Sequence, residues 1–169
     1  MRVFPNTVVT ETVAAQSREN LNLMCCIERH HASGMIGHCY VDGFNLKNGA
    51  IAQTVGHDAH NITVLGDNPR DMLLAVNGLS SDGGLVLVKD GRLIGRLPLE
   101  IAGLMTDATA ETALKIRGEL FKALSEMDYN KNIEPFMLLS FMTLIVIPDA
   151  KLNHKGLFGV SKWNYLYKG

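Results

Sequence analysis

The densest group of side chains that could carry chemistry lies between residues 57 and 61, in the order His-Asp-Ala-His-Asn. In an extended chain His57 and Asn61 share one face while Asp58 and His60 share the other; in a helical turn His57, His60 and Asn61 converge. Either arrangement can place an imidazole beside a carboxylate, a pairing that fixes the histidine tautomer and suits proton transfer. These four residues are therefore candidates for a polar ligand-binding or catalytic site.

Three interpretations of this segment remain open. His57 and His60 could present two nitrogens to a metal, but catalytic zinc sites take three protein ligands, and the sequence has no His-Glu-x-x-His or Cys-x-x-Cys motif. We therefore predict no metal site here. The amide of Asn61 could instead read a purine, since it matches the adjacent donor and acceptor of adenine. Alternatively, the segment is a loop whose side chains cap strand ends and one another.

A second polar cluster, Glu28, Arg29 and His30, directly follows the apolar run from Leu23 to Ile27. A solvated strand end is the simplest explanation for these charged residues. Both clusters, however, flank segments that we expect to be core strands. We therefore predict that the two clusters meet at the ends of neighbouring strands and line one cleft.

Composition and charge exclude several classes of protein. The 169 residues are 47% hydrophobic and 20% charged, which predicts a folded domain with a substantial core. Lys and Arg number 16 against 17 Asp and Glu, for a net charge of −1 without a basic block, so nucleic acid is not an expected partner. The longest uncharged apolar run, Pro135 to Ile147, is shorter than the roughly 20 residues that cross a bilayer. With no visible secretory signal and three cysteines without metal-type spacing, we expect reduced thiols and a cytoplasmic protein.

The periodicity of apolar residues predicts an α+β fold in one domain over residues 1–169. Strands are predicted at 7–10, 21–27, 39–41, 50–55, 62–65, 143–147 and 163–167. Asn68-Pro69 begins a helix that stops at Gly83-Gly84, a second helix runs from about Thr109 to Asp128, and a short one begins near Phe136. Asp90-Gly91 joins strands 85–89 and 92–97 into a hairpin. This order of strands and helices along the chain predicts a layered α/β sandwich with a mixed, largely antiparallel sheet and two main helices.

The two polar clusters belong to a series of short motifs that covers nearly the whole chain. The series comprises Glu28-Arg29-His30, Gly43-Phe44, 49–55, 57–61, 64–66 and Asp71-Met72, then Gly83-Gly84, 97–99, 101–105, Pro135-Phe136, 139–141 and 146–148. In its residues and their order it resembles the C-terminal domain of the bacterial adenine deaminases of the amidohydrolase superfamily. Ala59, Glu100, Ile145 and Gly159 depart from the residues usual in that family.

The resemblance implies a hydrolase of purine metabolism that converts adenine to hypoxanthine and ammonia. Members of the family carry, before this domain, a barrel whose bound manganese or iron generates the hydroxide that attacks C6 of adenine. This sequence has no His-x-His motif and no room for a barrel of about 250 residues. We therefore expect a domain detached from the barrel, without a cofactor of its own and inactive when alone.

The resemblance also suggests how the polar clusters are used. Glu28, Arg29 and His30, together with residues 57–61, would face the mouth of the barrel's active site. The expected partner is a separate barrel subunit or a second copy of the chain. An alternative is a non-catalytic binding or assembly module that uses the same surface for a purine-like ligand or a protein. A third possibility is an independent hydrolase with a histidine-based metal site.

Overall fold

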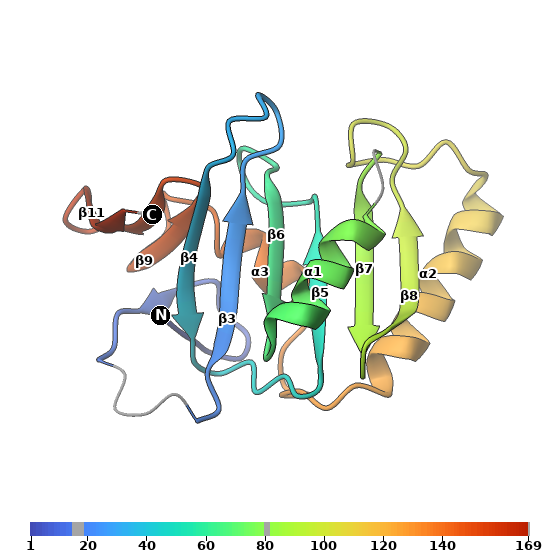
Figure 1. Cartoon of the computed structure of the whole chain (residues 1–169), viewed down its shortest axis with the longest axis horizontal. Helices are drawn as coiled ribbons and strands as arrows, with labels where there is room; N and C mark the ends of the chain where they lie inside the picture. Colours follow the sequence, from blue (N-terminus) through green and yellow to red (C-terminus); the bar gives the residue numbers. More distant parts are fainter. Residues whose placement is uncertain (15–18, 80–81, 169) are drawn as a thin grey trace.

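A six-stranded antiparallel sheet runs through the middle of the molecule (Figure 1). The computed structural model describes residues 1–14, 19–79 and 82–168. The strands follow the order β4-β3-β6-β5-β7-β8 across the sheet. Their bounds are β3 Asn22–Ile27, β4 Ile36–Val41, β5 Gly49–Gln53, β6 Ile62–Gly66, β7 Gly84–Lys89 and β8 Arg92–Pro98. Because β3 pairs with β6, the residues that follow β3 come close to those that precede β6.

Two smaller sheets complete the β structure. The strands β9 Ala150–Asn153, β10 Gly156–Gly159 and β11 Asn164–Lys168 form a sheet that packs against β4, with β11 at its edge as predicted. The strands β1 Arg2–Val3 and β2 Thr10–Glu11 form a short pair. Every pair of named strands is antiparallel, so the structure confirms the α+β class and makes the sheet more uniform than the mixed one predicted.

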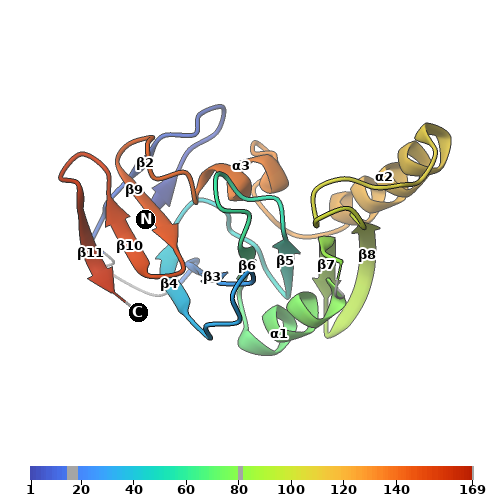
Figure 2. The ribbon, with the colours of Figure 1, turned by 90° about the horizontal axis from the view of Figure 1, so that it is seen from above.

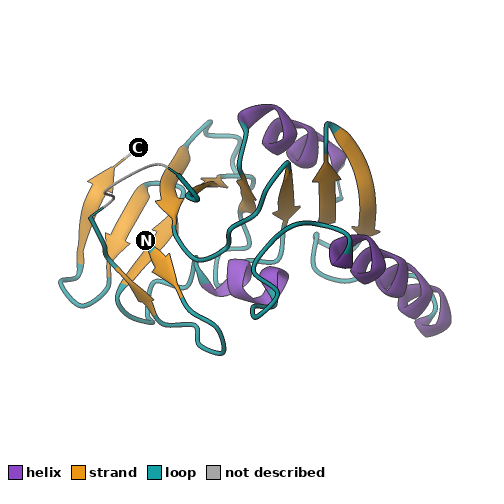
Figure 3. Cartoon of the chain, turned by 90° about the horizontal axis from the view of Figure 1, so that it is seen from below, coloured by secondary structure: helices purple, strands orange, loops and turns teal. Residues whose placement is uncertain are grey.

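Helices cover both faces of the central sheet, as the layered prediction requires (Figures 2 and 3). Helix α1, Pro69–Gly78, packs on β5 to β8 above a small core that includes Ala52 and Val86. Helices α2, Ala110–Ser125, and α3, Pro135–Phe141, lie on the opposite face over a larger core that includes Ile51 and Leu87. Between these layers all five residues of β5 are buried. None of the helices in the described ranges is long and apolar enough to cross a membrane.

Local sequence signals set the boundaries of several elements. The Asn68 side chain accepts the N–H of Asp71 at 2.9 Å at the start of α1, and Thr109 caps α2 in the same way. Asp90 and Gly91 both have positive φ, 51° and 72°, the conformation of a type I′ turn. The predicted helix starts and the predicted hairpin are therefore confirmed.

The predicted strand at 143–147 is wrong. This segment forms consecutive turns after α3. Leu144 donates its N–H to the carbonyl of Phe141, and Ile147 donates to the carbonyl of Leu144. These short-range bonds use the donors that a strand would have offered to a neighbour, so the segment joins no sheet.

Two other boundaries also differ from the prediction. Of the strand predicted at 7–10, only Thr10 pairs within β2. Helix α1 ends at Gly78, earlier than predicted, because the N–H of Leu79 bonds to the carbonyl of Val76 and closes the last turn. Positions 80 and 81 of the predicted helix lie outside the described residues.

Candidate functional site

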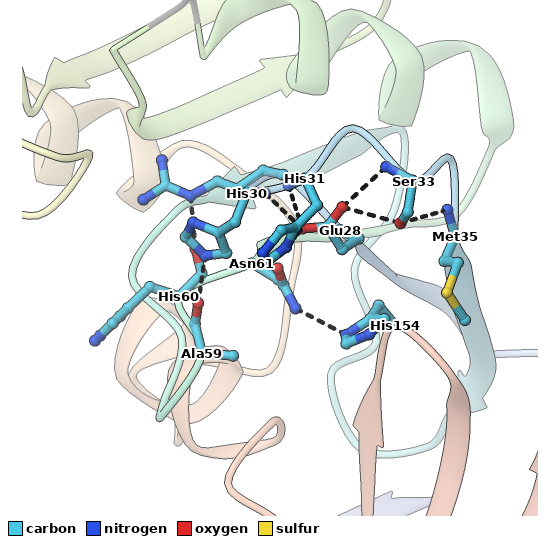
Figure 4. Close-up of polar contacts among 10 residues, drawn as sticks. Glu28, His30, His31, Ser33, Met35, Ala59, His60, Asn61 and His154 are labelled. Carbon is cyan, nitrogen blue, oxygen red and sulfur yellow. Dashed lines mark hydrogen bonds and ion pairs between the residues drawn. The ribbon is translucent and has the colours of Figure 1, made fainter.

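The two polar clusters meet where β3 ends and β6 begins, at one end of these neighbouring strands, as predicted (Figure 4). The Arg29 side chain donates from Nε to the carbonyl of His60 at 2.7 Å, and the His30 ring bonds from Nε2 to the carbonyl of Ala59 at 2.6 Å. The antiparallel pairing of β3 with β6 explains this, since it places the end of one strand beside the start of the other. We call Arg29, His30 and residues 57–60 the polar edge.

Glu28 organises the loop that begins the polar edge. Its carboxylate accepts the backbone N–H groups of His30 at 2.5 Å, His31 at 2.9 Å and Ser33 at 3.1 Å, and the Ser33 hydroxyl at 2.9 Å. These hydrogen bonds, that from the Ser33 N–H most of all, lower the pKa of Glu28 to about 2. The carboxylate is thus engaged by its own loop, and Glu28 positions its neighbours instead of offering a free ligand.

The depressed pKa of Glu28 predicts a loss of stability in acid. The ordinary pKa is 4.5 and the folded value is about 2, so the unfolded chain binds more protons between these values and the protein loses stability as the pH falls through this range. We expect Glu28→Gln to lower the urea midpoint at pH 7 and to flatten its decline between pH 5 and pH 2. The control is Glu119→Gln on the exposed face of α2. An unchanged decline in Glu28→Gln would contradict this role.

Arg29 connects three segments of the chain. Besides His60, its guanidinium donates from Nη2 to the carbonyl of Ala102 at 2.5 Å, and it lies against Gly103, where a Cβ atom would be 2.5 Å from Nη1. Partial burial lowers the pKa of the guanidinium, which nevertheless stays charged. The loop that contains Ala102 was not part of the predicted site. Residues 101–105 belong to the motif series of the resemblance, but no spacing in the sequence connected this loop with Arg29.

His57 is held by α3. Its N–H donates to the carbonyl of Ser140 at 3.0 Å, and its own carbonyl accepts the Thr143 hydroxyl at 2.8 Å. The ring packs against Phe141 at a centroid distance of 4.9 Å. Asp58, the next residue, is exposed. Residues 143–147, predicted as a strand, therefore form turns, and the Thr143 hydroxyl in these turns holds His57 of the polar edge in place.

The His60 ring is a neutral hydrogen-bond donor. Its Nδ1 accepts the N–H of Gly56 at 3.2 Å, so the ring proton is on Nε2. Desolvation by burial, with a smaller repulsion from His57, lowers the pKa of His60. The ring therefore stays uncharged at neutral pH.

Asn61 lies apart from the polar edge, on the face of the sheet that carries the larger core. It is 5% exposed, and its Nδ2 lies 3.1 Å from Nδ1 of His154 (Figure 4). Its Oδ1 has no hydrogen-bond partner among the described residues. No motif or spacing pointed to His154, which comes from the turn between β9 and β10. Asn61 does not line the cleft described next, so the structure separates it from His60, which does.

A cleft of 560 Å³ opens at the polar edge between the ends of β3 and β6, the last turns of α1 and the loop after β8. Its polar lining includes Arg29, His30, Thr54, His60, Asp82 and Glu100, and its apolar lining includes Ile62, Val76, Leu79 and Leu104. Of the seven predicted site residues, Arg29, His30 and His60 reach this cleft. Glu28 and His57 hold the adjoining loops in place.

No three or more His, Cys, Asp or Glu side chains in the described part of the chain are grouped so that they could hold a metal ion. His30 and His60 each engage a ring nitrogen with the backbone. The described residues therefore offer no ligand set for the manganese or iron that the resemblance places in the barrel. Fold and site together define an α+β domain that presents a histidine-containing polar cleft.

Comparison with known proteins assigns this domain to a family. The family model of the adenine deaminase C-terminal domain matches residues 2–164, and the chain belongs to this family. It is 42% identical over 153 residues to an adenine deaminase of Nitratidesulfovibrio vulgaris, covering 89% of this chain and 27% of that protein. The corresponding enzyme of Clostridium acetobutylicum is 44% identical over 148 residues, covering 86% and 26%. That of Halalkalibacterium halodurans is 37% identical over 179 residues, covering 98% and 30%. The chain thus spans little more than a quarter of these curated relatives.

Proposed function

We propose that this chain works as the C-terminal domain of an adenine deaminase and that its polar edge faces the active-site mouth of a metal-dependent barrel. The observation that carries the proposal is the convergence of both polar clusters on one cleft. The described residues include no group of metal ligands. We therefore expect that the chain does not activate water for attack on adenine without the barrel.

The polar edge is suited to binding and orientation. His60 presents Nε2–H as a donor, and His30 keeps Nδ1 as an acceptor because its Nε2–H is engaged by Ala59. One donor beside one acceptor complements the edge of a purine or a polar backbone segment. Manganese or iron bound in the barrel would supply the hydroxide for attack at C6. Arg29, fixed on two carbonyls, holds the loops of the polar edge in position.

The proposed partner is the barrel, as a separate subunit or as another part of one polypeptide. Association with a second copy of the chain is compatible with the same surface. The cysteines at 25, 26 and 39 are free, and this supports a reducing compartment such as the cytoplasm.

The first test is deamination by the chain and by a hybrid enzyme. We expect no ammonia release from adenine by the chain alone, with or without added manganese, iron or zinc. A hybrid in which this chain replaces the matching part of the Clostridium acetobutylicum enzyme is expected to release ammonia. His60→Ala in the hybrid should lower that activity at least tenfold, whereas Glu119→Gln on α2 should not.

Two results would contradict this function. Turnover by the chain alone that tracks bound metal and disappears in His57→Ala would identify an independent hydrolase. Calorimetric binding of adenine to the chain alone, with a folded but inactive hybrid, would favour the purine-binding alternative.

A further inference from the structure

An apolar groove lies beside α1 on the face of the central sheet that carries this helix. Helix α1 packs on β5 to β8, and β3 stays open beside it on this face (Figures 1 and 2). On β4, the His38 ring packs against Tyr167 of β11 at a centroid distance of 5.2 Å, which marks the outer border of the open surface. The groove has a volume of 190 Å³. Its lining includes Leu23, Cys25 and Ile27 of β3, Val64 of β6, and Leu73 and Val76 of α1.

Large apolar side chains remain exposed along the rim of this groove. Leu73 on α1 is 63% exposed, and Ile36 on β4 is 48% exposed. Exposed apolar side chains beside an apolar groove mark an interaction site.

The dimensions of the uncovered surface fit one α-helix. Neighbouring strands lie about 4.8 Å apart, so β3 and β4 together present a width of about 10 Å. This equals the diameter of a helix with its side chains, about 10 Å, and helices pack side by side at about 8–10 Å. A helix lying next to α1 would complete the layer on this face.

We propose that the groove binds an amphipathic helix from the remaining part of an adenine deaminase; this inference rests on the proposed function above. The matching region is only 26–30% of three relatives, so most of each relative's polypeptide lies outside this domain and could supply that helix. The groove is also continuous with the polar cleft, because Val76 lines both. A barrel that faces the cleft is therefore placed beside the groove.

Cys25 reports directly on whether the groove is covered. Its thiol lines the groove and is partly exposed, whereas Cys26 and Cys39 are buried. The experiment measures the rate at which N-ethylmaleimide modifies Cys25, followed by mass spectrometry of its peptide. The rate is compared between the chain alone and the hybrid enzyme. We expect modification at least tenfold slower in the hybrid.

Two matched substitutions of leucine by glutamate test whether the partner helix binds at this groove. In the hybrid, Leu73→Glu is expected to restore most of the modification rate of Cys25. Leu114→Glu is the control, because Leu114 is also an exposed helical leucine, 67% exposed, but lies on α2 away from the groove. Thermal melts of both variants verify that they fold.

The outcomes separate this inference from the proposed function. Unprotected Cys25 in an active hybrid would overturn the groove proposal and leave the proposed function standing. A folded, metal-loaded hybrid without activity would count against the proposed function itself. Modification of the chain alone that slows with rising protein concentration, together with a dimer in light scattering, would assign the groove to a second copy and overturn our choice of partner.

Discussion

Replacing Gly37 with alanine is expected to destabilise the protein by about 3 kcal/mol or more. Gly37 lies in β4 where the C-terminal sheet packs on the central sheet. A Cβ atom there would lie 1.9 Å from the carbonyl oxygen of Asn153 and 2.8 Å from the nitrogen of Gly156. Both contacts are backbone atoms, so no change of rotamer relieves them, and β4 must separate from the turn between β9 and β10. Urea denaturation monitored by circular dichroism measures the loss.

The matched control is Gly118→Ala. Gly118 lies within α2, and a Cβ atom there would meet nothing within 4 Å. Alanine at an open helical position is expected to stabilise the protein by about 0.5–1 kcal/mol. The same chemical change should therefore have opposite signs at the two sites. A Gly37→Ala protein as stable as the unchanged chain would show that the two sheets are not in close contact.

Replacing Gly103 with alanine is the second substitution with a large expected effect, about 3 kcal/mol. Its φ is +71°, and a Cβ atom would lie 2.5 Å from Nη1 of Arg29 and 2.9 Å from Oγ1 of Thr54. Thr54 is buried and bonds to the Gly103 carbonyl at 2.6 Å, so it has little freedom to move. Arg29 must leave its carbonyl partners, and the polar edge loses the side chain that ties its segments together. In the hybrid enzyme we expect the activity to fall as well.

Gly34→Ala separates backbone strain from the displacement of Arg29. Gly34 has a similar φ, +73°, but a Cβ atom there would meet nothing within 4 Å. Its substitution should cost only the strain of a left-handed residue, about 1 kcal/mol. In an Arg29→Ala background, Gly103→Ala should then cost less than in the unchanged protein, because only the backbone strain and the contact with Thr54 remain, as a double-mutant cycle reveals. Additive costs would contradict contact between the two residues.

In the polar edge, the sequence was sufficient to predict that the two clusters lie close together, but it did not predict what each side chain does there. Both clusters flank core strands, and this was enough to predict that they meet. Their individual roles depend on which atoms lie opposite. Glu28 bonds to its own loop, whereas Arg29 reaches the carbonyl of Ala102, 73 residues away. No spacing in the sequence distinguishes these two neighbours.

Elements whose causes are local could be predicted from the residues alone. Asn68 and Thr109 cap helices through backbone groups three residues away, and Asp90-Gly91 adopts the turn that its own conformational preferences favour. Such features need only a few neighbouring residues, so composition and periodicity are sufficient to predict them.

Apart from the meeting of the two polar clusters, contacts between distant groups could not be predicted before the packing of the elements was known. Asn61 bonds to His154, 93 residues away, instead of joining His60 in the cleft. His60 ends a turn, with a left-handed φ of 49° and its N–H on the carbonyl of Gly56, so the chain changes direction between these two residues just before β6 begins. The turns at 143–147 replaced a predicted strand because the backbone donors of Leu144 and Ile147 bond to carbonyls three residues earlier, next to α3. The apolar groove likewise exists because α1 packs on four of the six strands of the central sheet and leaves β3 open beside it. Contacts of this range depend on how whole elements pack, and no local pattern of residues encodes them.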